Sequence, residues 1–163
     1  MTLKEFKFQY ALGSISEEDL IDIAKKSTSN YILTTLSKDE DEYIRKCVAI
    51  NKNTSKKILT KLSKDENFYV RISIAKNPNT SKKVLTKLSK DRNMAIRYWT
   101  AKNPNTPIKI LILQSKNNDW AMKQCVADNP NTPVEVLTKL SKDKDWNINK
   151  LAKKTLLDKG IKV

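Results

Sequence analysis

Leucine recurs along the chain at a fixed spacing of 26 residues, and proline shows the same period. The positions are Leu33, Leu59, Leu85, Leu111 and Leu137, with Pro78, Pro104 and Pro130. A fixed period of this size is typical of repeat proteins, in which each repeat packs only on its neighbours. The sequence therefore predicts a stack of about five repeats of 26 residues each.

Apolar and polar positions within a repeat predict two short helices. In the first, Val84, Leu85 and Leu88 form one apolar stripe, and Lys83 and Lys87 lie on the opposite side. The first helix is thus expected to be an outer, lysine-coated one.

The first helix is expected to begin at a threonine N-cap. These caps are Thr54, Thr80, Thr106 and Thr132. Pro107 and Pro133 would then occupy the first helical position, and Thr132 with Glu135 matches a capping box.

The second helix is expected from Asn67 to Ala75, with counterparts at 93–101 and 119–127. It ends there because the residue before each proline is pushed out of the helical region. The expected core contacts are pairs four residues apart, Val70 with Ile74, Ile96 with Thr100 and Met122 with Val126. A small residue recurs at one position, which predicts close helix approach: Ala49, Ala75, Ala101 and Ala127.

The two ends of the chain depart from the pattern. Residues 1–32 are expected to form an N-terminal cap and half repeat, in which residues 3–12 fit either a helix or a strand and Ser16 caps the next helix. The predicted repeats are 33–58, 59–84, 85–110, 111–136 and 137–150. Residues 151–163 are expected to form a C-terminal cap, because Leu157 replaces the corner asparagine, and the whole of 1–163 is then a single monomeric domain.

One motif makes the repeat specific. The pattern L-x-x-L-S-x-D-x-x-x-x-V-R-x-x-x-A-x-N-P-x-T-P is clearest in residues 85–110 and 111–136. It resembles the leucine-rich repeat variant family, which is similar to HEAT-like solenoids. The resemblance implies an all-α, right-handed α-α superhelix with some 3₁₀ helices. Some members of that family carry a cysteine cluster for an iron–sulfur centre, but this chain has no such cluster, so no cofactor is expected.

The net charge of +14 favours an acidic partner, namely an acidic protein or peptide, or a nucleic acid. The simpler alternative is that lysine-rich faces only keep the stack soluble. No apolar run is long enough for a membrane span and no signal core precedes the repeats, so a cytoplasmic protein without membrane insertion is expected.

Lysine is densest in residues 59–110, where rows of it could follow a phosphate backbone or simply face solvent. The phosphate-contact candidates are Lys61, Lys64, Lys83, Lys87 and Lys90.

An acid and an arginine recur six residues apart. The pairs are Asp39 with Arg45, Asp65 with Arg71, and Asp91 with Arg97. An arginine row for phosphates is one interpretation, and a structural ladder joining adjacent repeats, as the resemblance to HEAT-like repeats implies, explains the joint spacing better. Asn117 with Lys123 should weaken the ladder, and Asn149 should end it.

The second helices carry a further face at positions i, i+4 and i+8. Its members are Phe68, Ile72, Lys76, Met94, Tyr98, Lys102, Trp120, Gln124, Trp146 and Lys150. In a two-layer solenoid this face would line the concave side and bind a partner, or it would be packing between repeats. Stacking of nucleobases would use the same aromatic side chains.

Other chemistry is sparse. Cys47 and Cys125 stand three periods apart, too far for a disulfide, and are expected to be buried thiols, with Trp99 at the same repeat position in the core. Histidine is absent, and no catalytic or metal-ligand motif occurs. Asp119 beside Trp120 faintly echoes helical-repeat DNA glycosylases, but a helix N-cap explains Asp119 better. The sequence therefore predicts a non-enzymatic scaffold that binds a protein or peptide through its concave second-helix face, with nucleic-acid binding as the alternative.

Overall fold

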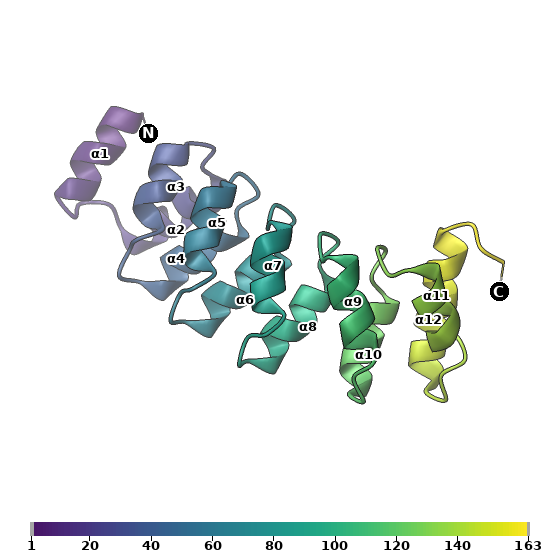
Figure 1. Cartoon of the computed structure of the whole chain (residues 1–163). Coiled ribbons are helices and arrows are strands. Elements are labelled where there is room, and N and C mark those ends of the chain that lie inside the picture. Colours follow the sequence, from purple (N-terminus) through teal and green to yellow (C-terminus); the bar gives the residue numbers. More distant parts are fainter. Residues whose placement is uncertain (1, 163) are drawn as a thin grey trace. The chain divides into compact units, whose positions relative to one another are not determined.

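The computed structural model describes residues 2–162 and contains twelve α-helices in that range (Figure 1). In chain order they are α1 (Leu3–Ala11), α2 (Glu17–Lys26), α3 (Asn30–Leu36), α4 (Glu42–Ile50), α5 (Lys56–Leu62), α6 (Phe68–Lys76), α7 (Lys82–Leu88), α8 (Met94–Lys102), α9 (Ile108–Ser115), α10 (Trp120–Ala127), α11 (Val134–Leu140) and α12 (Trp146–Asp158). The all-α repeat class is therefore confirmed. The 3₁₀ helices that the resemblance implied do not occur between residues 2 and 162, where every helix is α.

The chain divides into two compact units, 1–80 with α1 to α6 and 81–163 with α7 to α12. Inside the first unit, α4 packs between α2 and α6; inside the second, α10 packs between α8 and α12. The first helices, α3, α5, α7, α9 and α11, pack on second helices and hardly on one another. Each unit therefore has a continuous row of second helices, and the prediction of a single 1–163 domain stays a prediction.

The predicted core pairs are buried. Val70, Ile74, Ile96, Thr100 and Val126 have no exposed surface, and the four repeated alanines are equally covered. Because helices of seven to nine residues are marginal alone, this burial between neighbours holds them in place.

A ladder of buried side-chain amides joins successive repeats. Asn77 donates two hydrogen bonds from Nδ2, to the carbonyls of Ala49 (2.8 Å) and Asn51 (3.1 Å). Asn129 does the same in the second unit, to Ala101 (2.6 Å) and Asn103 (2.9 Å). Each asparagine thereby satisfies the two carbonyls at the end of the preceding second helix, where no intrahelical donor remains. The sequence suggested only corner residues here.

The expected threonine caps are wrong by one residue. Thr54 and Thr80 are buried, and their hydroxyls donate to the carbonyls of Val48 (2.6 Å) and Ile74 (2.7 Å). The N-cap is the following serine, Ser55 or Ser81, whose side chain accepts from the backbone N–H three residues on. The threonine points inward because it ends the turn that begins at the asparagine of the same repeat.

The two proline-containing corners also differ from expectation. Pro107 and Pro133 are N-caps and not the first helical residues, and neither helix has a side-chain cap bond. The predicted capping box at Thr132 is thus absent, because that hydroxyl donates to the carbonyl of Val126 (2.6 Å).

The N-terminal segment is a helix and not a strand. Thr2 and Glu5 form a capping box at the start of α1, and Gly13, with φ of 63°, ends the segment in the left-handed region that glycine tolerates. Ser16 caps α2 as predicted, accepting from the N–H of Asp19.

The expected boundary at residue 150 falls inside helix α12, so the division into a last repeat and a C-terminal cap stays a prediction. Helix α12 runs for 13 residues, from Trp146 to Asp158. The longer helix is possible because Leu156 stands where Pro130 ends the preceding second helix. Thr155 stands in the ladder position of Asn129 and donates one bond, to the carbonyl of Ala127 (2.7 Å).

Candidate binding pocket on the second helices

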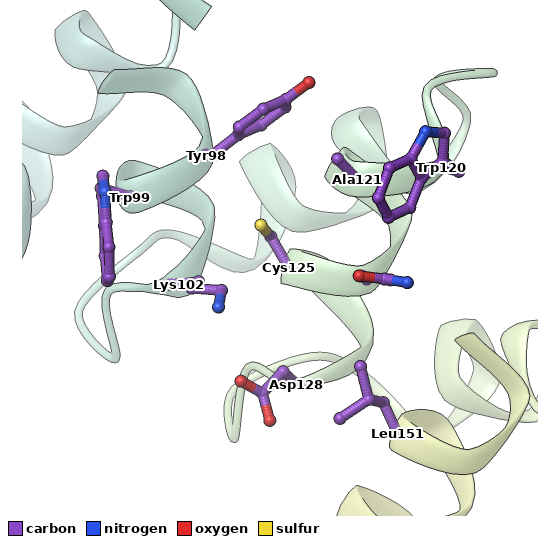
Figure 2. A pocket seen from close by; sticks show the side chains of 9 residues that line it. Tyr98, Trp99, Lys102, Trp120, Ala121, Cys125, Asp128 and Leu151 are labelled. Atoms are coloured by element: carbon purple, nitrogen blue, oxygen red, sulfur yellow. The ribbon is translucent and has the colours of Figure 1, made fainter. Parts of the chain in front are cut away.

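A pocket of about 280 Å³ opens on the second helices of the second unit (Figure 2). Its lining comes from α8, from α10 with its C-cap Asp128, and from α12, and consists of Tyr98, Trp99, Lys102, Trp120, Ala121, Gln124, Cys125, Asp128 and Leu151. Figure 2 shows Tyr98 and Lys102 on α8, Trp120 and Cys125 on α10, and Leu151 on α12. Four of the predicted partner-binding residues meet here: Tyr98, Lys102, Trp120 and Gln124.

Small residues leave the space for this pocket. Ala121 occupies the repeat position that Tyr43 and Tyr69 occupy in α4 and α6, and the buried thiol of Cys125 lies one turn further along α10. In the first unit, the ring of Tyr43 lies 5.7 Å from Nζ of Lys25 on α2, so a tyrosine at this position reaches toward the preceding second helix. The alanine at position 121 leaves the corresponding gap open.

Tyr98 is fixed at one wall by a short hydrogen bond. Its hydroxyl donates to Oδ2 of Asp119 at 2.5 Å. Oδ1 of the same carboxylate accepts from the backbone N–H groups of Ala121 and Met122, so Asp119 is the N-cap of α10 as predicted. The bond raises the pKa of Tyr98 to about 12 and lowers the pKa of the Asp119 carboxyl below its ordinary value. Both oxygens of the Asp119 carboxylate therefore accept hydrogen bonds, one from the Tyr98 hydroxyl and the other from the first turn of α10.

Trp99 is not a core residue. It is 37% exposed, whereas Cys47 and Cys125 at the same repeat position are buried. A site that holds a cysteine is too small for an indole, so Trp99 lies outside it, with Nζ of Lys102 5.5 Å from its ring. The ring thereby becomes part of the pocket lining.

The remaining second-helix candidates lie outside this pocket. Trp146 is 68% exposed and has Nζ of Lys150 over its ring at 4.6 Å. Met94 is exposed on α8. In the first unit, Phe68 is exposed and Ile72 half-buried on α6, which also carries Lys76.

The phosphate-contact candidates are all solvent-exposed. Lys61, Lys83 and Lys87 lie on first helices, while Lys64 and Lys90 follow the ends of α5 and α7. None of the five pairs with a carboxylate in the part of the chain that the structure describes.

The acid–arginine positions form rungs between adjacent repeats. In the first unit, Nε and Nη2 of Arg45 donate to the two oxygens of Asp65 at 2.8 and 3.0 Å. Asp39 accepts from the hydroxyl of Tyr10 at 2.8 Å, and the pKa of Tyr10 rises to about 12 through burial and this bond. The Arg45 guanidinium is thus occupied by a carboxylate, which argues against a phosphate-binding role for it.

The other arginines also bind backbone carbonyls of their own repeats. Arg71 donates to the carbonyl oxygens of Asp65 and Glu66, and Arg97 to those of Asp91 and Arg92.

The rung persists in the fourth repeat despite the loss of arginine. Nζ of Lys123 donates to Asp143 at 3.0 Å, so lysine substitutes there. Asn149 donates instead to the carbonyl of Ser141 (2.6 Å). The sequence placed these residues on the ladder but predicted that Lys123 would weaken it, whereas Lys123 forms the rung with Asp143.

Cys47 and Cys125 are free and buried, and burial raises the pKa of both thiols, which keeps them protonated. No three acidic or thiol side chains among the described residues are placed to hold a metal ion. No helix in residues 2–162 is both long and apolar enough to cross a bilayer.

Part of the pocket lining was missed from the sequence. Ala121 and Leu151 escaped notice because neither is unusual in type: position 121 corresponds to Tyr43, Tyr69 and Ala95 in the earlier repeats, so alanine already occurs there once. Trp99 was predicted to lie in the core, although an indole is too large for a repeat position that holds a buried cysteine in two other repeats.

Comparison with known proteins supports the fold. No protein-family model matches the chain, and a search of curated proteins gives no match. Among the solved structures that are similar is one described as "a leucine-rich repeat variant with a novel repetitive protein structural motif", with a TM-score of 0.64 and 21% identity. The match covers 93% of this chain and 64% of that one. The predicted likeness to leucine-rich repeat variants is confirmed at the level of the fold.

Proposed function

We propose that the protein is a non-enzymatic helical-repeat scaffold that binds an acidic protein or peptide through its second-helix face. The observation that carries this proposal is the pocket on α8 and α10, which brings Tyr98, Trp120 and Gln124 together beside Lys102. Exposed aromatic side chains around a pocket are typical of interface hot spots. The similar solved structure supports a repeat scaffold and names no partner.

The charge favours an acidic partner. The protein carries +14, and Lys102 and Lys150 on the second helices have no carboxylate partner among the described residues. Oppositely charged surfaces accelerate encounter and exclude wrong partners, so a basic scaffold selects against basic ligands.

A display selection tests the proposal. A random 12-residue peptide library is panned against the immobilised full chain, with the bare support as control. Enrichment of net-acidic peptides is expected, and their binding should weaken with added salt because screened charges attract less. Enrichment of basic or uncharged peptides, or no enrichment above the support, would contradict the proposal.

Nucleic-acid binding is the second candidate, favoured by the exposed lysines without carboxylate partners, Lys87 and Lys90 among them. If it holds, a duplex and a single-stranded oligonucleotide should bind at low salt, and the affinity should fall steeply as salt rises. The Lys87→Glu, Lys90→Glu double variant should bind more weakly still. If neither oligonucleotide shifts in a gel at low salt, this candidate fails.

A further inference from the structure

We propose that the pocket between α8 and α10 is an anchor subsite that takes one aromatic side chain of an acidic peptide. The inference rests on the proposed function and specifies which part of the partner this site recognises.

The same fold already places a ring at the corresponding position of the first unit. There the ring of Tyr43 on α4 lies with Nζ of Lys25 at 5.7 Å and Nζ of Lys46 at 4.6 Å. Both lysines have counterparts beside the pocket. Lys25 directly follows Ala24, whose carbonyl accepts a ladder amide (2.9 Å), and Lys46 directly precedes the buried Cys47.

In the second unit, the residue after the ladder alanine Ala101 is Lys102, and the residue before the buried Cys125 is Gln124. Both line the pocket, and Ala121 stands in the place of the tyrosine. The pocket is thus the site of an aromatic ring that this part of the chain does not supply.

The side chains that line the pocket suit an aromatic ring supplied by a bound peptide. Tyr98, Trp99 and Trp120 present aromatic surface, and Trp120 is 61% exposed. A pocket of about 280 Å³ has room for a phenyl, phenol or indole side chain. Aromatic pairs in stacked or edge-to-face contact bind more strongly than their buried area alone implies.

The polar groups of the lining suit a peptide backbone. Gln124 is half-buried, and its side-chain amide has no hydrogen-bond partner among the described residues. A free amide presents a donor and an acceptor together, which matches the N–H and C=O of an extended peptide. A few such groups are what orients a ligand in an otherwise apolar pocket.

Local charge favours a peptide over a nucleic acid. Residues 111–136, which supply most of the lining, carry a net charge of −1, whereas residues 137–163 carry +5. Asp128 and Lys102 are the charged members of the lining, so the pocket itself offers no cationic excess to a phosphate. Carboxylates of the peptide on either side of the aromatic residue can pair with Lys102 and with Lys150 on α12. The aromatic residue itself binds without a phosphate group.

The test compares two variants on the peptides that the display selection enriches. Ala121→Tyr fills the pocket with the residue that the chain itself uses at positions 43 and 69. Trp120→Ala removes one wall. Both are expected to weaken binding of the enriched peptides at least tenfold, as measured by fluorescence anisotropy of labelled synthetic copies. The matched control is Tyr31→Ala, which removes an exposed aromatic ring from the first helix α3, outside the second-helix face, and it should change binding less than twofold.

The enriched peptides should share an aromatic residue flanked by acids, and replacing that residue with alanine should abolish the effect of Ala121→Tyr. Enrichment of acidic peptides without a common aromatic, or equal binding by wild type and Ala121→Tyr, would overturn the anchor site and leave the scaffold function standing. An empty selection would overturn both. A single-stranded oligonucleotide that binds wild type tenfold more tightly than Ala121→Tyr would show a nucleobase site and also overturn the inference.

Discussion

The gap between α2 and α4 and the gap between α8 and α10 are built on the same frame but are filled differently. In the first gap Tyr43 lies within reach of Lys25 and Lys46; in the second, Ala121 leaves a pocket bordered by Lys102 and Gln124. The frame is held by buried asparagines and alanines, which do not vary between the two. The comparison indicates that stability resides in the repeated positions, and the proposed binding specificity would then come from the few positions where the repeat departs from itself.

The largest expected effect is on the shared frame. Asn77→Ala and Asn129→Ala each remove two bonds to buried carbonyls, one in each unit. Because unsatisfied buried carbonyls are costly, each variant should lose about 2 to 4 kcal/mol of unfolding free energy. Urea denaturation followed by circular dichroism measures it. A loss below about 0.5 kcal/mol in either unit would show that the ladder does not hold the frame.

The rungs should differ between the units. Asp65→Asn weakens a two-bond pair with Arg45 whose side chains are 11% and 7% exposed, and should cost about 2 kcal/mol. Asp143→Asn weakens a single bond to Lys123 in a more open pair, and should cost about 0.5 kcal/mol. The same denaturation experiment measures both, and equal costs would remove this difference between the units.

The gap between α2 and α4, which Tyr43 occupies, can be opened by substitution. Tyr43→Ala should cost no more than about 1 kcal/mol, because the ring is already 42% exposed. It should also add weak binding of the aromatic-containing peptides to the first unit, seen as a second site in calorimetry. An unchanged stoichiometry would indicate that Gln124, Trp99 and Trp120 are needed in addition to an empty position.

The smallest expected effect is on the wall of the pocket. The Tyr98–Asp119 bond lowers the pKa of the carboxyl and raises that of the phenol, so its contribution to stability is full between the ordinary values of 3.8 and 10.0. It is lost as pH falls through the lowered pKa of Asp119, and as pH rises toward 12.

In Asp119→Asn the cap should survive, since Asn67 and Asn93 cap α6 and α8, and the pKa of Tyr98 should return toward 10. Ultraviolet absorbance of the phenolate follows this titration. A pKa of Tyr98 that stays near 12 in the variant would show that burial, and not Asp119, sets it.

The repeat pattern predicted most of the frame and only part of the pocket. The 26-residue period located α6, α8 and α10 to within a residue or two, because apolar spacing and the residue before proline act locally. The threonine caps were misplaced because Thr54 and Ser55 are both good caps in isolation, and only the corner decides which one turns inward.

The pocket was partly predictable from the sequence because Tyr98 on α8 and Trp120 and Gln124 on α10 fall on the equivalent face of their two helices. The pocket exists because position 121 carries an alanine in place of a tyrosine, and because the small buried site at the cysteine position does not hold the Trp99 ring. These are properties of packing between helices, which a single-chain periodicity does not encode.

The most direct test of the central claim uses the three tryptophans, which all lie in the second unit. Their indole N–H groups give three separate signals in a ¹⁵N correlation spectrum, and two of them, Trp99 and Trp120, line the pocket while Trp146 does not. On titration with an enriched acidic, aromatic-containing peptide, the signals of Trp99 and Trp120 should shift and that of Trp146 should move least. A shift confined to Trp146, or no shift of Trp120 at saturating peptide, would contradict the account.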